Sequence, residues 1–418
     1  MATTNWLGVA DAVAQISTGS IDSVDGTPAN NTYTVTIGGV AISQVGDTDV
    51  ATTAAALVVL LEASTHPYFA AVTWTNPSAG NITGTADTAG VPFTAVLTET
   101  GAGTGAVTDF SDDTACTGPN FWDDAENWSE GSAPGAGDDV VIADSSVNIA
   151  WGLDQSAVTV ASITIMDTYT GKIGLNYSAF ATSADAATVD TSKTDYRDSH
   201  LKIIPTLLDI GEGHGLGTGT GSGRINIDCH TDAVVATVHK TANVASETGR
   251  SAVSIKLNSG TAKLHVVSAT GGVFVGSRSD SPITKTTVGN IHVSAQSTSR
   301  VTVEDGTTLT TYRQDGGNCR LQCGATTVTV NGGQLTVQGD SAITTLNVHG
   351  GNVLHNGSGN ISTVNLIGGL LDMTGVGAAR TISTLAFSAG SFRADNDYIT
   401  ISAYTQPADG PYTLSVAV

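Results

Sequence analysis

Apolar and polar positions repeat in step along the C-terminal part of the chain. Residues 327–340 read TVTVNGGQLTVQGD, 345–358 read TLNVHGGNVLHNGS, 363–376 read TVNLIGGLLDMTGV and 384–397 read TLAFSAGSFRADND. Each copy is an alternating run, a Gly-Gly or Ala-Gly corner, a second short run and a polar turn. The corner glycines Gly333, Gly351, Gly369 and Gly390 are spaced by 18, 18 and 21 residues. A period near twenty with short strands predicts a solenoid.

Stacked repeats of this kind bury their alternate side chains in columns, because one unit alone cannot cover its apolar face. One predicted column is Val328, Leu346, Val364 and Leu385, and a second is Val330, Val348, Leu366 and Phe387. The glycines suit corners that need a positive φ angle. We therefore predict a mainly β fold with a right-handed parallel β-helix, whose regular repeats occupy 327–404. An antiparallel meander with Gly-Gly hairpins is the alternative.

Residues 143–326 predict less regular rungs of the same solenoid. The expected strands are 158–165, 201–210, 224–228, 253–257, 263–267, 291–294 and 301–303. Residues 178–199 form a polar insertion without periodicity, and 211–223 are rich in glycine. The glycine-rich stretch lacks the Lys-Ser/Thr of a phosphate-binding loop and predicts a projecting turn. Residues 405–418 are expected to form a C-terminal strand or cap.

The N-terminal part of the chain predicts an extended arm over 1–30 and a compact domain over 31–108. Within the arm Trp6 and Leu7 are apolar, which favours docking either on a neighbouring subunit or on the arm's own domain. In the domain, alternation around Gly38-Gly39 predicts a β-hairpin, and the spacing of apolar residues after Asp49 predicts a helix over 49–63. Strands at 68–75, 81–86 and 92–98 complete a ββαβββ order.

Small and polar residues at 109–119 predict a linker, and 120–142 (NFWDDAENWSEGSAPGAGDDVVI) predicts a cap that opens the solenoid. Trp122 and Trp128 would cover the apolar end of the core, since an uncovered end exposes apolar side chains and strand edges. The carboxylates of this segment are candidate Ca²⁺ ligands, and solvated turns are the alternative reading of the same residues. They are Asp123, Asp124, Glu126, Asp138 and Asp139.

Charge is distributed unevenly, with no Lys or Arg before Lys172 and a net charge of −22. Such an acidic chain repels phosphate backbones and anionic lipid surfaces, which argues against nucleic-acid binding and membrane association. No apolar run is long enough for a membrane helix, and the N-terminus lacks the features of a secretory signal peptide. The four cysteines have no disulfide or zinc spacing, so we expect free thiols.

No residue pattern in the chain predicts catalysis. Acids are sparse in the regular repeats and unpaired, the nine histidines are dispersed, and aromatic residues make up 5% of the sequence. A polysaccharide-cleaving site needs converging carboxylates or a carboxylate with a basic partner. We therefore expect no enzyme and no catalytic residue, no cofactor apart from the candidate Ca²⁺, and a depolymerase only as the least favoured alternative.

The first domain carries a resemblance to a known family. YTVTIGG, the Gly-Asp-Thr before an Ala-rich helix, AVTW, NITGTA and GVPFTAV are similar to a small domain of tailed-phage and prophage virion proteins. The 120–142 segment resembles one that opens solenoids in bacterial surface and autotransporter-like proteins. The first resemblance implies a structural virion protein (capsid decoration, head fibre or tail-associated fibre), and the second leaves a cell-surface adhesin or S-layer-like protein as the alternative.

These resemblances also imply partners. We expect residues 1–110 to bind capsid or tail proteins, the chain to form a homo-oligomer, with a trimer favoured, and the solenoid to meet a host-surface glycan. The expected location is the virion, or the bacterial surface under the alternative.

Overall fold

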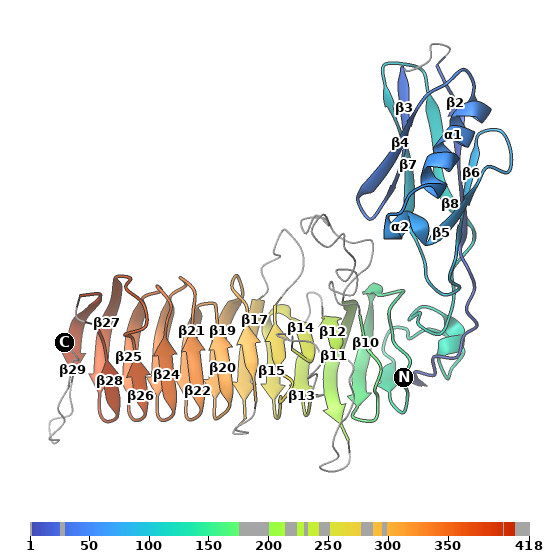
Figure 1. Cartoon of the computed structure of the whole chain (residues 1–418). Helices are drawn as coiled ribbons and strands as arrows, with labels where there is room; N and C mark the ends of the chain where they lie inside the picture. The colour runs from blue at the N-terminus through green and yellow to red at the C-terminus, as the bar shows by residue number, and fades with distance from the viewer. Residues whose placement is uncertain are drawn as a thin grey trace.

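Most of the chain is a parallel β-solenoid, and a smaller antiparallel domain stands beside its N-terminal end (Figure 1). The computed structural model describes residues 2–25, 30–174, 200–213, 224–229, 233–241, 251–276, 287–294, 299–395 and 397–405. Among these residues no helix is long and apolar enough to cross a membrane. The predicted mainly β solenoid is confirmed. The predictions for 178–199, for 406–418 and for most of 211–223 fall outside the described residues.

The first sheet of the solenoid receives one strand from nearly every rung, each paired in parallel with the next. Its strands are β1 (Thr3–Asn5), β9 (Asp139–Ile142), β10 (Asp154–Met166), β11 (Leu201–Glu212), β13 (Val235–Val238), β15 (Asn258–Val266), β17 (Thr287–Val293), β19 (Thr308–Gln314), β21 (Ala325–Val330), β23 (Ile343–Val348), β25 (Ile361–Leu366), β27 (Arg380–Phe387) and β29 (Ile399–Thr405). Because the pairing is in register, each side-chain position continues along the whole rod.

The second sheet faces the first across the core and is also parallel. Its strands are β12 (Ile225–Asp228), β14 (Val253–Lys256), β16 (Val273–Val275), β18 (Val301–Val303), β20 (Asn318–Leu321), β22 (Gln334–Val337), β24 (Asn352–His355), β26 (Leu370–Asp372) and β28 (Ser391–Arg393). In the regular rungs the first residues of β21, β23, β25 and β27 bend away and form a short third side. Ala325, Ile343, Ile361 and Ile382 pair there in register.

The predicted inward columns are present. Val328 pairs with Leu346, Leu346 with Val364, and Val364 with Leu385, and all four are fully buried. The second column, Val330, Val348, Leu366 and Phe387, is buried beside it. At the corners the glycines adopt positive φ angles, such as +73° at Gly351, where an added Cβ would lie 2.5 Å from the carbonyl oxygen of Gly333. A left-handed backbone and a close neighbouring rung together require glycine here.

The helix and hairpin expected near the N-terminus belong to a separate domain with its own apolar core. It consists of a four-stranded antiparallel sheet and a three-stranded one, with α1 (Val50–Glu62) and α2 (Pro67–Ala70). The sheets contain β2 (Ile16–Ser23), β3 (Asn31–Ile37), β4 (Val40–Val45), β5 (Val72–Thr75), β6 (Asn81–Ala86), β7 (Ala95–Gly101) and β8 (Ala106–Thr114). Asp49 caps α1 by accepting a hydrogen bond from the backbone of Thr52 at 2.8 Å, as its residue type favours.

The arm, the linker and the predicted ββαβββ order differ from the structure, because residues 68–70 of the strand expected at 68–75 lie in α2 and two further strands, β2 and β8, belong to the domain. Much of the expected arm is β2, which pairs with β8 in the four-stranded sheet, so the expected linker over 109–119 begins within a strand. Val13 and Thr117 then form an antiparallel bridge between the two chain segments that leave the domain. The sequence could not reveal this pairing because the two partners are far apart along the chain. The domain, residues 14–116, is thus an insertion into the first unit of the solenoid, held on a two-stranded stem (Figure 1).

The first rung is assembled from both sides of this insertion. β1 pairs with β9, placing Thr3 opposite Asp139, and Trp6 bridges to Trp128. Trp6, Trp122 and Trp128 are all buried in the solenoid core, with edge-on rings whose centroids lie 5.1 and 4.7 Å from that of Trp128. A short 3-10 turn (Ala125–Asn127) precedes Trp128. Trp6 therefore packs on the solenoid of its own chain, a partner that neither of the two predictions for it named.

Candidate functional site

The carboxylates proposed as Ca²⁺ ligands in the 120–142 segment do not converge on a common point, and three of them accept hydrogen bonds from the protein. Asp124 accepts from the backbone of Glu126, Asp138 from that of Gly135 at 2.9 Å, and Asp139 from the hydroxyl of Ser162 at 2.6 Å. Asp123 and Glu126 are exposed. Within the described ranges no three His, Cys, Asp or Glu side chains come together in a way that could hold a metal ion. The geometry therefore favours the turn reading of these residues.

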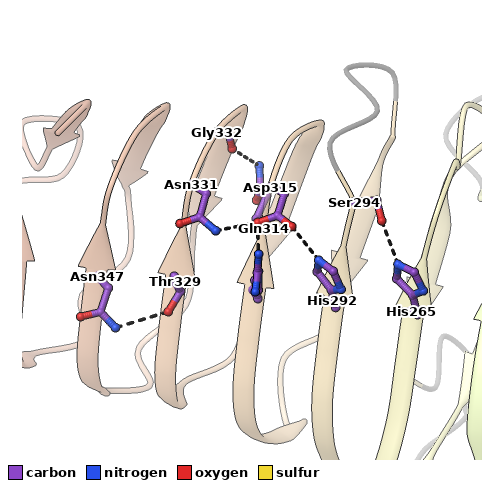
Figure 2. A network of polar contacts seen from close by, with 10 residues as sticks. His265, His292, Ser294, Gln314, Asp315, Thr329, Asn331, Gly332 and Asn347 are labelled. Carbon is purple, nitrogen blue, oxygen red and sulfur yellow. Dashed lines mark hydrogen bonds and ion pairs between the residues drawn. The ribbon is translucent and has the colours of Figure 1, made fainter. Parts of the chain in front are cut away.

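A different set of polar side chains gathers on the outer face of the first sheet, and Figure 2 shows four of its members, His265, His292, Ser294 and Asp315. We call it the histidine row: Asp209, His239, His265, His292, Ser294 and Asp315. His265 and His292 are opposite each other on β15 and β17, pointing outward between buried neighbours. Their rings are stacked nearly parallel, with centroids 4.8 Å apart and an interplanar angle of 8°. The stacking follows directly from the in-register pairing of adjacent parallel strands.

Each imidazole of the row contacts a different polar partner through Nε2. His239 lies 3.1 Å from Asp209 Oδ1, His265 lies 2.8 Å from Ser294 Oγ, and His292 lies 2.7 Å from Asp315 Oδ2. Asp315 is the best-connected member. Its Oδ1 also accepts from Arg313 Nε at 3.0 Å and from Asn331 Nδ2 at 2.6 Å, so one carboxylate joins three successive rungs.

These contacts set the charge states of the row. Burial tends to raise the pKa of Asp315, but hydrogen bonds from Arg313, Asn331 and His292 outweigh it and lower that pKa to about 2. Asp315 is therefore ionised throughout the ordinary pH range. Burial lowers the pKa of His265, and the neighbouring His292 and His239 lower it further. A ring stacked on another imidazole gains its proton at a cost, since two like charges would then face each other.

Beyond the histidine row, an uncharged strip continues the same outer face toward the C-terminus. We call it the polar track: Thr327, Thr329, Asn331, Thr345, Asn347, Thr363 and Asn365. The amide of Asn365 donates to Asn347 Oδ1 at 2.8 Å, and that of Asn347 donates to Thr329 Oγ1 at 3.3 Å. The residues are in register and half-buried, so the strip offers hydroxyls and amides at the rung spacing of about 4.8 Å.

The histidine row does not form a nucleophilic triad. In a triad one imidazole contacts the nucleophile with one nitrogen and an orienting carboxylate with the other. Here Ser294 contacts His265, whereas Asp315 contacts His292, so hydroxyl and carboxylate belong to different rings. The arrangement instead offers polar and charged groups, in line along the rod, for binding.

A second polar cluster lies inside the last rungs. Arg380 is 2% exposed and its guanidinium donates to backbone carbonyls, including those of Met373 at 2.6 Å and His355 at 2.7 Å. His355 is 1% exposed, and its Nε2 has no hydrogen-bond partner in the described part of the chain. Burial, followed by the charge of Arg380, lowers the pKa of His355 to about 4. This pair belongs to the interior of the solenoid and is inaccessible to a ligand.

Sequence reasoning judged the histidines dispersed and missed the row. The rungs that carry His239, His265 and His292 are longer than the 18-residue rungs of the regular part, since Val238 pairs with Val266 and Val266 with Val293. One signal was present, because each follows or lies within an alternating apolar run: VATVH, KLHV and NIHV. Aligning those runs instead of the glycine corners would have brought the three residues together.

No family model, curated protein or solved structure matches this chain, so its function has to be inferred from its own residues.

Proposed function

We propose that the chain is a non-enzymatic structural protein of a phage-like particle. In this proposal the inserted domain, residues 14–116, attaches to a capsid or tail protein, and a right-handed parallel β-helix projects away from it. The assignment to a particle rests on the resemblance of residues 31–108 to virion proteins. The attachment role rests on one observation: the domain has its own core and joins the rod at one end, through the stem at Val13 and Thr117.

The distribution of charge along the chain also supports attachment through the inserted domain. Residues 1–171 contain no Lys or Arg, whereas the 16 basic residues of the chain all follow. An acidic domain is steered toward a basic patch on a partner, with an association rate that falls as salt rises. Such a domain at the end of a rigid rod can hold the rod on a particle without involving the rungs in the contact.

The stem makes a clean test possible. The backbone nitrogen of Val13 lies 3.0 Å from the carbonyl oxygen of Thr117, so a short Gly-Ser link can replace residues 14–116 without moving the first rung. Removing residues 1–110 would be a poorer design, because it also deletes β1 and Trp6 from the solenoid. We expect the linked variant to fold and melt as a solenoid but to be absent from gradient-purified particles analysed by mass spectrometry.

One rung provides the matched control. Ile361 occupies the place of Ile343 one rung later, so deleting residues 343–360 shortens the rod and preserves its register. This variant should still be incorporated. If the full-length chain is itself absent from particles, the proposal fails. If the variant lacking 14–116 is incorporated normally, attachment lies in the rungs and the proposed polarity is reversed.

The cap favours a second candidate, a bacterial cell-surface adhesin or S-layer-like protein. The segment resembling solenoid openings in surface proteins supplies Trp122 and Trp128, which close the core. Under this alternative, protease treatment of intact cells would release peptides of this chain, and particles would lack it.

We further propose that the chain acts as a homotrimer, as fibrous particle proteins with solenoids commonly do. Light scattering of the purified chain at micromolar concentration is the measurement. A monomer mass would remove this proposal for the free protein and leave the attachment proposal untouched.

A further inference from the structure

The outer face around the histidine row presents hydrogen-bond donors on three successive rungs. Lys263 and His265 lie on β15, Asn290 and His292 on β17, and Thr311 and Arg313 on β19. Lys263 is paired with Asn290 and Asn290 with Thr311, while His265, His292 and Arg313 form the neighbouring column. The donors therefore recur along the rod axis at the rung spacing of about 4.8 Å.

Several of these donors are not used by the protein. The ammonium of Lys263 and the Nη atoms of Arg313 have no partner among the described residues, and the side chain of Arg313 is 53% exposed. The two stacked imidazoles contact Ser294 and Asp315 through Nε2, which leaves their Nδ1 atoms without a partner in the same set. Two other lysines of the solenoid differ in this respect, since Lys202 pairs with Asp154 and Lys256 with Asp228.

We infer that this face binds a linear polysaccharide that bears carboxylates. Lys263, His292 and Arg313 would receive its carboxylates, and the polar track would receive its hydroxyls. A polyuronate is a linear chain in which every sugar carries one carboxylate and several hydroxyls. The rod presents matching groups along its axis, with cationic side chains around the histidine row and hydroxyls and amides on the polar track. An acidic peptide would use the cationic groups and leave the track of threonines and asparagines without matching groups. Sugar stacking on aromatic rings contributes little on this face, so charge and hydrogen bonds carry the recognition.

Protonation of the row should govern the strength of binding. The charged groups that face His265 and His292 are Lys263 from β15, Asp209 from β11, and Arg313 and Asp315 from β19, with His239 as a further titratable neighbour. With neutral imidazoles the two cations and two carboxylates cancel. Each imidazole that gains a proton adds one positive charge, so the face attracts anions more strongly as pH falls.

The test measures binding of polygalacturonate to the purified full-length chain by calorimetry at pH 7.5 and 5.5. We expect affinity to rise at least tenfold at the lower pH and to fall with added salt. The double variant Lys263→Gln, Arg313→Gln should bind at least tenfold more weakly at pH 5.5. Arg320→Gln is the matched control, since Arg320 is an exposed arginine on β20 of the second sheet and should bind as the parent does.

His292→Gln separates the role of the imidazole from that of the fixed cations. It should bind polygalacturonate as the parent does at pH 7.5 and show a smaller rise in affinity at pH 5.5, with an unchanged melting temperature at pH 7.5 as the check on folding. Equal binding by the double variant and by Arg320→Gln would overturn the site. Binding of polyglutamate as tight as that of polygalacturonate would overturn the assignment to a sugar polymer.

This inference goes beyond attachment. Binding is measured on the free chain, whereas attachment is measured on particles, so either proposal can fail without the other.

Discussion

The regular rungs near the C-terminus and the irregular rungs of the middle obey the same packing rule and look different in sequence. In the regular part Thr327, Thr345, Thr363 and Thr384 follow one another in register, and glycine corners mark every turn. In the middle Val235 pairs with Lys263, and Lys263 with Asn290, across segments of other lengths. Both regions bury one alternate set of side chains completely. In-register pairing of the strands, rather than a constant repeat length, is therefore what the two regions share.

The largest effect should come from a charge placed in the buried column. Leu346→Asp in the regular part and Leu264→Asp in the middle each bury an unpaired carboxylate, and we expect each to cost about 4 kcal/mol of unfolding free energy. Asn347→Asp, one residue along and facing outward, is the control and should cost under about 1 kcal/mol. Urea unfolding measures all three. A much smaller loss for Leu264→Asp would show that the middle rungs are held differently.

Corner glycines should separate the two regions. Gly351→Ala forces a methyl group into a left-handed backbone and against a carbonyl of the neighbouring rung, so we expect a loss of about 2 to 3 kcal/mol. Gly260, in β15 of the middle, is the matched site because an added Cβ would meet only the methyl group of Thr287 at 3.9 Å. Gly260→Ala should leave the melting temperature nearly unchanged. Equal losses at both sites would contradict the assignment of the corners as close contacts.

The smallest of these effects is the pH dependence of stability that comes from His355, near the end of the regular part. The pKa of His355 is lowered to about 4 in the folded chain from an ordinary value near 6.5, so the unfolded chain binds more protons between these values. Stability contributed by neutral His355 is therefore complete above about pH 6.5 and decreases as pH falls toward 4.

Relative to its value at pH 7, we expect a loss of about 2 kcal/mol from this residue at pH 5. His355→Leu provides the comparison, because it removes the titrating group and should lose less stability over the same interval. His265, whose pKa is also lowered, acts in the same direction in both proteins and cancels in the difference. Parallel pH profiles for the two proteins would disprove the role of His355.

How much of this could be predicted depended on whether partners were close in the sequence. The columns through Val328 and Leu346, the corner at Gly351 and the helix capped by Asp49 all follow from local pattern, and the structure contains them. The pairing of β2 with β8 and of Val13 with Thr117 left no local signal, so the first and last strands of the inserted domain were predicted as parts of an arm and a linker. The histidine row was missed for a related reason, since His265 and His292 are paired across a rung that is longer than the regular repeat.

The site residues proposed in the 120–142 segment illustrate the opposite error. Asp138 and Asp139 are adjacent to Val140 in the sequence and looked like a cluster of ligands. In the structure Asp138 accepts from the backbone of Gly135 in the turn before β9, whereas Asp139, the first residue of β9, accepts from Ser162 on the next rung. Proximity in sequence does not make side chains converge, whereas register between strands does.

The insertion also has a consequence for the order of events during synthesis. β1 leaves the ribosome first, but its partner β9 follows only after the whole inserted domain, with Thr3 waiting for Asp139. At about 5 to 20 residues per second the delay is on the order of ten seconds, long enough for the domain to fold by itself. When it does, the antiparallel stem brings the two chain segments together and delivers β1 and Trp6 to the emerging strand. We therefore expect the domain, once folded, to hold β1 beside β9 and so to close the first rung before the later rungs form.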